Sequence, residues 1–164
     1  MGLGGTTRLG VLLPVLGVLG VLGCVGCVSV DPGPDFVVPD ETFDANYFYC
    51  HVEPELIFEK NCGPGDPTLD KPNSCHFNGS AVSGMALLAH TAVDCGGGDL
   101  PVDNTQIGSG SAAQSNLEAV SLEMNRDYTT APLLIRPSGN NHPRTVFPRD
   151  DPQVNQLLST WASK

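Results

Sequence analysis

Basic residues are scarce in this 164-residue chain, which has 8 Lys and Arg against 18 Asp and Glu and a formal net charge of −10. Nucleic-acid binders need a basic face to neutralise phosphates, and adsorption to anionic lipid needs the same charge. Both kinds of partner are therefore disfavoured. The chain also lacks internal repeats, a Gly-rich phosphate loop and the Ser/His/Asp order or paired carboxylates of hydrolases. The sequence thus gives no support for an enzyme.

The first 27 residues contain a single charged residue, Arg8, before an apolar stretch rich in Gly, Val and Leu. A short, glycine-rich stretch with a positive start is typical of a secretion signal rather than a transmembrane helix. The segment 21–24 resembles a bacterial lipobox, which implies a signal peptide at 1–23 and lipidation of Cys24. Cys27 is a weaker candidate. Ordinary cleavage of a secreted protein and an uncleaved membrane anchor are the alternatives. We expect lipid anchoring in the bacterial cell envelope.

Residues 24–40 should form the lipid anchor and a tether, because segment 28–40 carries three prolines and three aspartates. A strand at 36–38 is the alternative. Residues 41–164 remain, enough for one domain with one core.

Apolar periodicity predicts mainly helices in this domain. The first should span 41–61, with Asp40 as its cap, a kink or split before Pro54 and a stop at Cys62-Gly63. Further helical segments are expected at 112–126 and 130–134, the second with Pro132 near its first position. The last helix should begin at Asp150 or Asp151 and bury its apolar stripe, which consists of Val154, Leu157, Leu158 and Trp161. This pattern leaves little room for a sheet, so we expect an all-α fold.

Four cysteines, at positions 50, 62, 75 and 95, lie in the exported domain, and an exported location favours their oxidation. Four cysteines allow three pairings, which spacing alone does not distinguish. A disulfide between Cys62 and Cys75 would close a loop of about 14 residues and stabilise by roughly 3 kcal/mol. Cys50 would then pair with Cys95. A zinc site is a further alternative, although its spacing matches no usual pattern; its ligands would be Cys62, Cys75, His76 and Cys95.

Cys75 and His76 are adjacent, like the last two residues of the C-x-x-C-H haem attachment motif, but Pro72 occupies the position of its first cysteine. Several segments in order resemble cytochrome c domains of exported bacterial proteins. They are 52–56 followed by a cysteine and Cys-His, then 83–87, 131–137, 142–144 with Phe147, and 154–161. The resemblance covers about residues 41–164.

The resemblance implies a small, loop-rich, cytochrome c-like helical domain with haem c. Cys62 and Cys75 would hold the macrocycle, and His76 and His142 would bind its iron. Met85 and Met124 are thioether alternatives, although such methionines are usually core residues. The haem would need an apolar slot, whose expected lining is Phe48, Leu56, Met85, Leu134 and Trp161. The chain departs from the family by placing twelve residues between the two cysteines.

Two functions follow from these observations. The first is a haem-free envelope lipoprotein, stapled by two disulfides, with a binding or structural role and no cofactor. The alternative is a c-type haem protein that transfers single electrons at the cell envelope. The membrane, through the lipid anchor, is the expected partner in both, and the sequence names no protein or redox partner. We interpret His51 and His90 as ordinary surface or capping residues.

Overall fold

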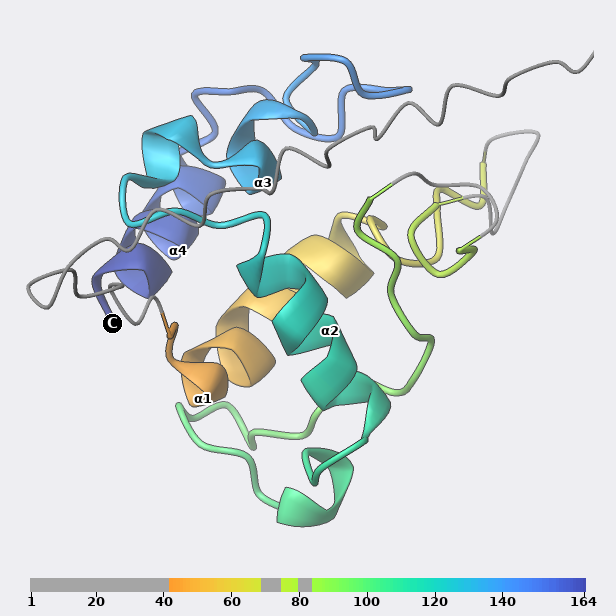
Figure 1. Cartoon of the computed structure of the whole chain (residues 1–164), viewed down its shortest axis with the longest axis vertical. Coiled ribbons are helices and arrows are strands. Elements are labelled where there is room, and N and C mark those ends of the chain that lie inside the picture. Colours follow the sequence, from red (N-terminus) through yellow and green to blue (C-terminus); the bar gives the residue numbers. More distant parts are fainter. Residues whose placement is uncertain (1–41, 69–74, 80–83) are drawn as a thin grey trace, which may run out of the picture. The chain divides into compact units, whose positions relative to one another are not determined.

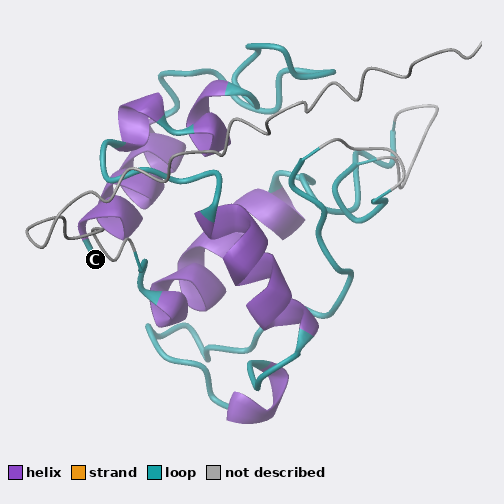
Figure 2. Cartoon of the chain, in the orientation of Figure 1, coloured by secondary structure: helices purple, strands orange, loops and turns teal. Residues whose placement is uncertain are grey.

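The computed structural model describes residues 42–68, 75–79 and 84–164. The expected signal peptide, Cys24, the tether, Asp40 and Pro72 lie outside the described residues. Within the described ranges the regular structure is helical and contains no strand, so the all-α prediction is confirmed (Figure 2). No helix in this part of the chain is long and apolar enough to cross a membrane.

The first helical region starts later than predicted. A short helix, α1 (Ala45–Tyr47), is capped by Asp44, whose carboxylate accepts a 2.7 Å hydrogen bond from the backbone N–H of Tyr47. It leads directly into η1, a π-helix spanning Phe48–Glu59. Pro54 lies inside η1. Proline has no N–H and its ring crowds the carbonyl four residues earlier, so an ordinary α-helical turn is disfavoured there. The helix widens to i→i+5 hydrogen bonding instead of splitting before Pro54.

The end of η1 also differs from the prediction. Asn61 has a φ of 58° and is the residue that leaves the helical conformation, so the stop comes before Cys62-Gly63. Gly63 serves another purpose. A Cβ atom on Gly63 would lie 2.5 Å from the ring of Phe77, which packs against Phe58 on η1 with ring centroids 5.9 Å apart. The glycine therefore permits close approach of the loop that returns from Cys75.

The middle of the chain is an irregular segment followed by one helix. Residues 85–93 bury Leu87 and Val93, and the short 3-10 helix η2 (Asn104–Gln106) follows. Helix α2 (Ala112–Ser121) begins at Ser111, whose hydroxyl accepts from the N–H of Gln114. It contacts η1 (Figure 1). The helix is shorter than the predicted 112–126, and Leu122, just after it, is 86% exposed.

The last part of the chain forms η3 (Tyr128–Thr130), α3 (Pro132–Ile135) and α4 (Pro152–Ser163). Pro132 and Pro152 each begin their helix, as predicted. The carboxylate of Asp151 caps α4 by accepting from the N–H groups of Gln153 and Val154. Helix α4 contacts both η1 and α3.

The core lies where α4 meets the first helical region. Trp161 is completely buried, and its ring lies 5.5 Å from that of Phe48 and 5.1 Å from that of Phe43. The burial of Val154, Leu158 and Trp161 confirms the amphipathic pattern of the last helix, whereas Leu157 is only partly buried. This packing joins the two ends of the domain and holds η1, whose C-terminal end leads to Cys62.

Candidate cofactor site: two histidines and two thiols

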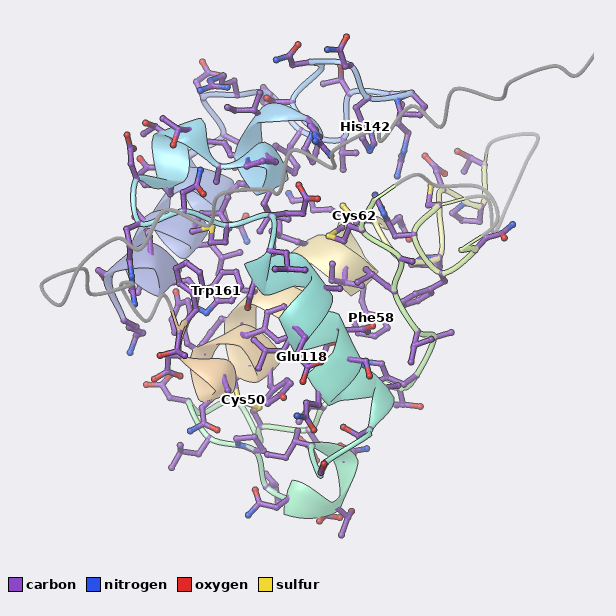
Figure 3. All side chains as sticks on the ribbon, in the orientation of Figure 1. Cys50, Phe58, Cys62, Glu118, His142 and Trp161 are labelled. Carbon is purple, nitrogen blue, oxygen red and sulfur yellow. A yellow bond between two sulfur atoms is a disulfide. The ribbon has the colours of Figure 1, made fainter. Side chains whose placement is uncertain are left out.

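The site begins where η1 ends and the loop after Cys62 returns. The backbone N–H of His76 donates to the carbonyl of Cys62 at 3.1 Å, and that of Phe77 donates to the carbonyl of Gly63 at 2.9 Å. These two bonds close the twelve-residue loop between the cysteines. Cys62 lies at the end of the helix, as Figure 3 shows, and the backbone of His76 is hydrogen-bonded to it.

His76 is held in one tautomer. Its Nδ1 lies 2.5 Å from the backbone carbonyl oxygen of Met85. A carbonyl can only accept, so Nδ1 carries the hydrogen and Nε2 keeps its lone pair. The carbonyl of His76 in turn accepts from the N–H of Leu87 at 2.9 Å. This arrangement is the usual one for a metal-binding histidine, in which a carbonyl on one ring nitrogen orients the other.

His142 is held in the same way on a different loop. Its Nδ1 donates to the carbonyl of Arg144 at 2.6 Å, which again leaves the lone pair on Nε2. Arg144 ties this loop to the end of η1. Its guanidinium donates to the carbonyl of Asn61 at 3.2 Å and lies 3.6 Å from the carboxylate of Asp66.

The two histidines come together although 66 positions separate them in the sequence. Their ring centroids are 6.2 Å apart and their planes differ by 24°. With nearly parallel planes, the two rings form a stacked pair. Burial lowers the pKa of His76, and His142 lowers it further, while the bond to Met85 opposes these effects. The neutral form, which can bind a metal, is favoured.

The predicted disulfide between Cys62 and Cys75 is not formed. Both are free thiols, Cys62 buried and Cys75 partly buried. Burial raises the pKa of Cys62 to about 12, with Arg144 acting in the opposite direction, so this thiol is protonated at neutral pH. The redox argument from an oxidising compartment favoured oxidation, but it carried no information on whether the two sulfurs meet in bonding geometry.

Cys50 and Cys95 form a disulfide with a Cα–Cα distance of 5.6 Å. It links η1 to the loop before η2. The prediction of two disulfide staples is therefore corrected to one in the described part of the chain. Because Cys95 is in this bond, the four-ligand zinc alternative is lost. Residues 42–68, 75–79 and 84–164 contain no group of three or more His, Cys, Asp or Glu side chains that could together hold a metal ion, and the two histidines and two thiols described above do not form one either.

Four of the five residues expected to line a haem slot are fully buried core side chains: Phe48, Leu56, Leu134 and Trp161. Phe48 and Trp161 pack against each other and form the closed joint between η1 and α4. Met85, the fifth, is partly buried and contributes its carbonyl to His76. Met124 is a buried core residue. The apolar pattern predicted burial correctly, but it did not distinguish a core position from a slot.

Sequence reasoning missed a buried polar cluster next to this site. Glu53, 0% exposed on η1, lies 2.9 Å from Nε2 of His90 and 3.4 Å from the amide nitrogen of Asn116 on α2. His51 was correctly interpreted as a surface residue, because it pairs with exposed Asp99 at 2.8 Å. His90 was not. The only available signal was a glutamate within the apolar stripe 52–57 of the first helix.

No protein-family model matches the chain, a search of the curated proteins gives no match, and a search of the solved structures gives none. The likeness to cytochrome c domains thus depends on the sequence motifs alone.

Proposed function

We propose that the protein is a c-type haem protein of the bacterial cell envelope, with His76 and His142 as the two iron ligands and Cys62 and Cys75 as the thioether cysteines. The observation that carries this proposal is the histidine pair. Two imidazole rings, each donating Nδ1–H to a carbonyl so that Nε2 is the nitrogen available to a metal, lie 6.2 Å apart between centroids. Two such donors suit haem iron.

Each chain residue has a definable task in this proposal. The carbonyls of Met85 and Arg144 select the tautomer of the two ligands. Arg144 holds the His142 loop to Asn61, so the second ligand stays near the first. The thiols of Cys62 and Cys75 are free and could form bonds to the macrocycle. Haem bound there would supply one-electron transfer.

The envelope location is part of the same proposal and is supported by residues 1–40. A lipid on Cys24, followed by the proline- and aspartate-rich tether, would hold the domain at a membrane surface. Replacing Cys24 by Ala should release the protein from the membrane fraction or block its processing, with Cys27→Ala as the matched control. Unchanged membrane association and unchanged processed mass in the Cys24 variant would contradict this assignment.

The second candidate function is the haem-free envelope lipoprotein with a binding or structural role. It is favoured by the tight packing of Phe48, Leu56, Leu134 and Trp161, which belong to the core rather than to an open slot. The Cys50–Cys95 disulfide would stabilise such a domain without any cofactor.

An absorption spectrum of the protein purified from its own envelope separates the two candidates. The haem proposal requires a Soret band that survives denaturation, because thioether bonds retain the haem. His142→Ala should shift the band, and Cys62→Ser with Cys75→Ser should abolish covalent retention. His51→Ala is the matched control, since His51 pairs with Asp99 on the surface. A colourless wild-type protein would overturn the haem proposal in favour of the haem-free one.

A further inference from the structure

A glutamate that belongs to none of the functions above is completely buried beside the histidine site. Glu53 lies on η1, and its Oε1 is 2.9 Å from Nε2 of His90 and 3.4 Å from Nδ2 of Asn116. Its second oxygen, Oε2, is buried without a hydrogen-bond partner among the described residues. A fully ionised carboxylate in this place would be costly, because one oxygen would have no donor.

The geometry of His90 determines how many protons this pair holds. Nδ1 of His90 lies 2.7 Å from the carbonyl oxygen of Thr91, so Nδ1 must carry a hydrogen. A bond between Nε2 and Oε1 then needs one proton between them, whether it belongs formally to the histidine or to the glutamate. If that proton is lost, a lone pair of Nε2 faces a carboxylate oxygen, and the contact becomes repulsive.

The surroundings keep this proton bound. Burial is the main factor that raises the pKa of Glu53, against the opposing effects of His90 and Asn116. Tyr49, one turn earlier on η1, is also buried, and its pKa is raised by burial and then by Glu53 and Glu118 of α2. Neither Tyr49 nor Glu118 can carry a positive charge, so neither of them stabilises an ionised Glu53.

The pair holds one end of the segment 85–90, and the other end holds His76. Asn116 bonds both backbone groups of Leu88, accepting from its N–H at 2.7 Å and donating to its carbonyl at 3.0 Å. At the opposite end, the carbonyl of Met85 accepts from Nδ1 of His76, and the N–H of Leu87 donates to the His76 carbonyl. The segment is thus a bridge between the buried glutamate and the candidate ligand.

We propose that Glu53 is a positioning residue: the proton that it shares with His90 holds the segment 85–90 against η1 and α2, and this segment holds His76 in the tautomer that leaves Nε2 free. We call the Glu53–His90–Asn116 group the latch. The latch itself does not depend on haem. Only the reading of His76 as an iron ligand rests on the proposed function.

Two substitutions of Glu53 separate a proton-bridged latch from a merely structural glutamate. Glu53→Gln keeps the shape and can donate an amide N–H to Nε2 of neutral His90, as the protonated acid does. Its amide nitrogen cannot accept the long 3.4 Å bond from Asn116, but Asn116 keeps both of its bonds to Leu88, so the latch should be preserved. Glu53→Leu fills a similar volume but offers no donor, which leaves His90 and Asn116 without their buried partner. Glu59→Leu, an exposed position on the same helix, is the matched control.

The readout is amide hydrogen exchange of the peptide covering 85–93 in the full exported protein, in whatever haem state it is isolated. Glu53→Leu should reduce protection there by about tenfold, because an unpartnered buried group destabilises the local structure. Glu53→Gln and Glu59→Leu should leave the protection of 85–93 unchanged. The protection of α4 should be unchanged in all three variants. Histidine ¹⁵N signals of the diamagnetic protein should report loss of the single His76 tautomer in Glu53→Leu alone.

Wild-type protein provides a second test if Glu53→Leu does not fold. Raising the pH should lower the protection of 85–93 in the wild type, after correction for intrinsic exchange, but not in Glu53→Gln. Equal pH responses of these two proteins, or unchanged protection in a folded Glu53→Leu, would overturn the latch. A missing Soret band would contradict the haem proposal but not the latch proposal, because the exchange experiment needs no haem.

Discussion

The indole N–H of Trp161 donates a 3.0 Å hydrogen bond to the backbone carbonyl of Asp44. Asp44 is the residue whose side chain caps α1, so the last helix of the domain is bonded to the starting point of the first. Together with the packing of the Trp161 ring on Phe43 and Phe48, this hydrogen bond joins the two ends of the domain.

Replacing Trp161 by Ala should lower the free energy of unfolding by about 3–5 kcal/mol, because a fully buried indole leaves a cavity that the core fills only partly. Trp161→Phe, which keeps most of the volume and removes the indole bond to the Asp44 carbonyl, should cost only about 1–3 kcal/mol, because that carbonyl still accepts from the N–H of Phe48. Urea unfolding followed by circular dichroism measures both. A loss below about 0.5 kcal/mol for the alanine variant is the size of a surface change and would contradict this packing.

Removing the Cys50–Cys95 disulfide should destabilise the domain by about 4 kcal/mol in the chain-entropy model, because the bond closes a loop with a sequence separation of 45. The double variant Cys50→Ala, Cys95→Ala and the reduced wild-type protein should show the same midpoint in urea. If the double variant were as stable as the oxidised wild type, the bond would not constrain the unfolded chain.

Gly63→Ala should disturb the loop that presents Cys75 and His76. Its Cβ would meet the Phe77 ring at 2.5 Å, so the ring must move, and overpacking of this kind costs about 1–3 kcal/mol. Gly108→Ala is the control, because nothing lies within 4 Å of a Cβ atom there. Thermal unfolding of both variants measures the difference. Equal melting temperatures would show that Phe77 does not pack on Gly63 in solution.

Local patterns explain why the last helix could be predicted closely. Asp151, Pro152 and the spacing from Val154 to Trp161 act within one element, and the structure reproduces each of them. The first helix was harder to predict. Both Asp40 and Asp44 are suitable caps, and the apolar residue Phe43 favoured the earlier one, but Phe43 packs on Trp161 from outside the helix.

The site shows the same division between local and long-range information. The Cys-His pair pointed to His76, and the resemblance pointed to His142. The role of His90 depends on a buried partner 37 positions away, which no local spacing reveals. The disulfide pairing was inferred from the redox compartment and from the entropy of loop closure. Neither argument says how the cysteine side chains are oriented in the fold. Its outcome was therefore right for Cys50–Cys95 and wrong for Cys62–Cys75.

The buried proton of the latch also predicts how stability depends on pH. Burial raises the pKa of Glu53 in the folded protein, so the folded state retains a proton that the unfolded chain releases above its ordinary glutamate pKa. The stabilisation is complete below that value and is lost as the pH rises toward the folded pKa, with a limiting slope of about 1.4 kcal/mol per pH unit for one proton.

Other groups restrict where this slope can be read cleanly. The pKa of His76 is lowered, which makes stability fall toward acid pH, below about 6.5, and adds no slope where the histidine is neutral in both states. The pKa of Tyr49 is raised, which makes stability fall as the pH approaches and passes about 10. As the pH rises above the ordinary glutamate pKa of about 4.5, urea unfolding should therefore show wild-type stability falling relative to that of Glu53→Gln, because His76 and Tyr49 contribute equally in both proteins. Parallel curves for the two proteins would mean that Glu53 is already ionised in the fold at neutral pH, with His90 and Asn116 unable to keep the shared proton in place.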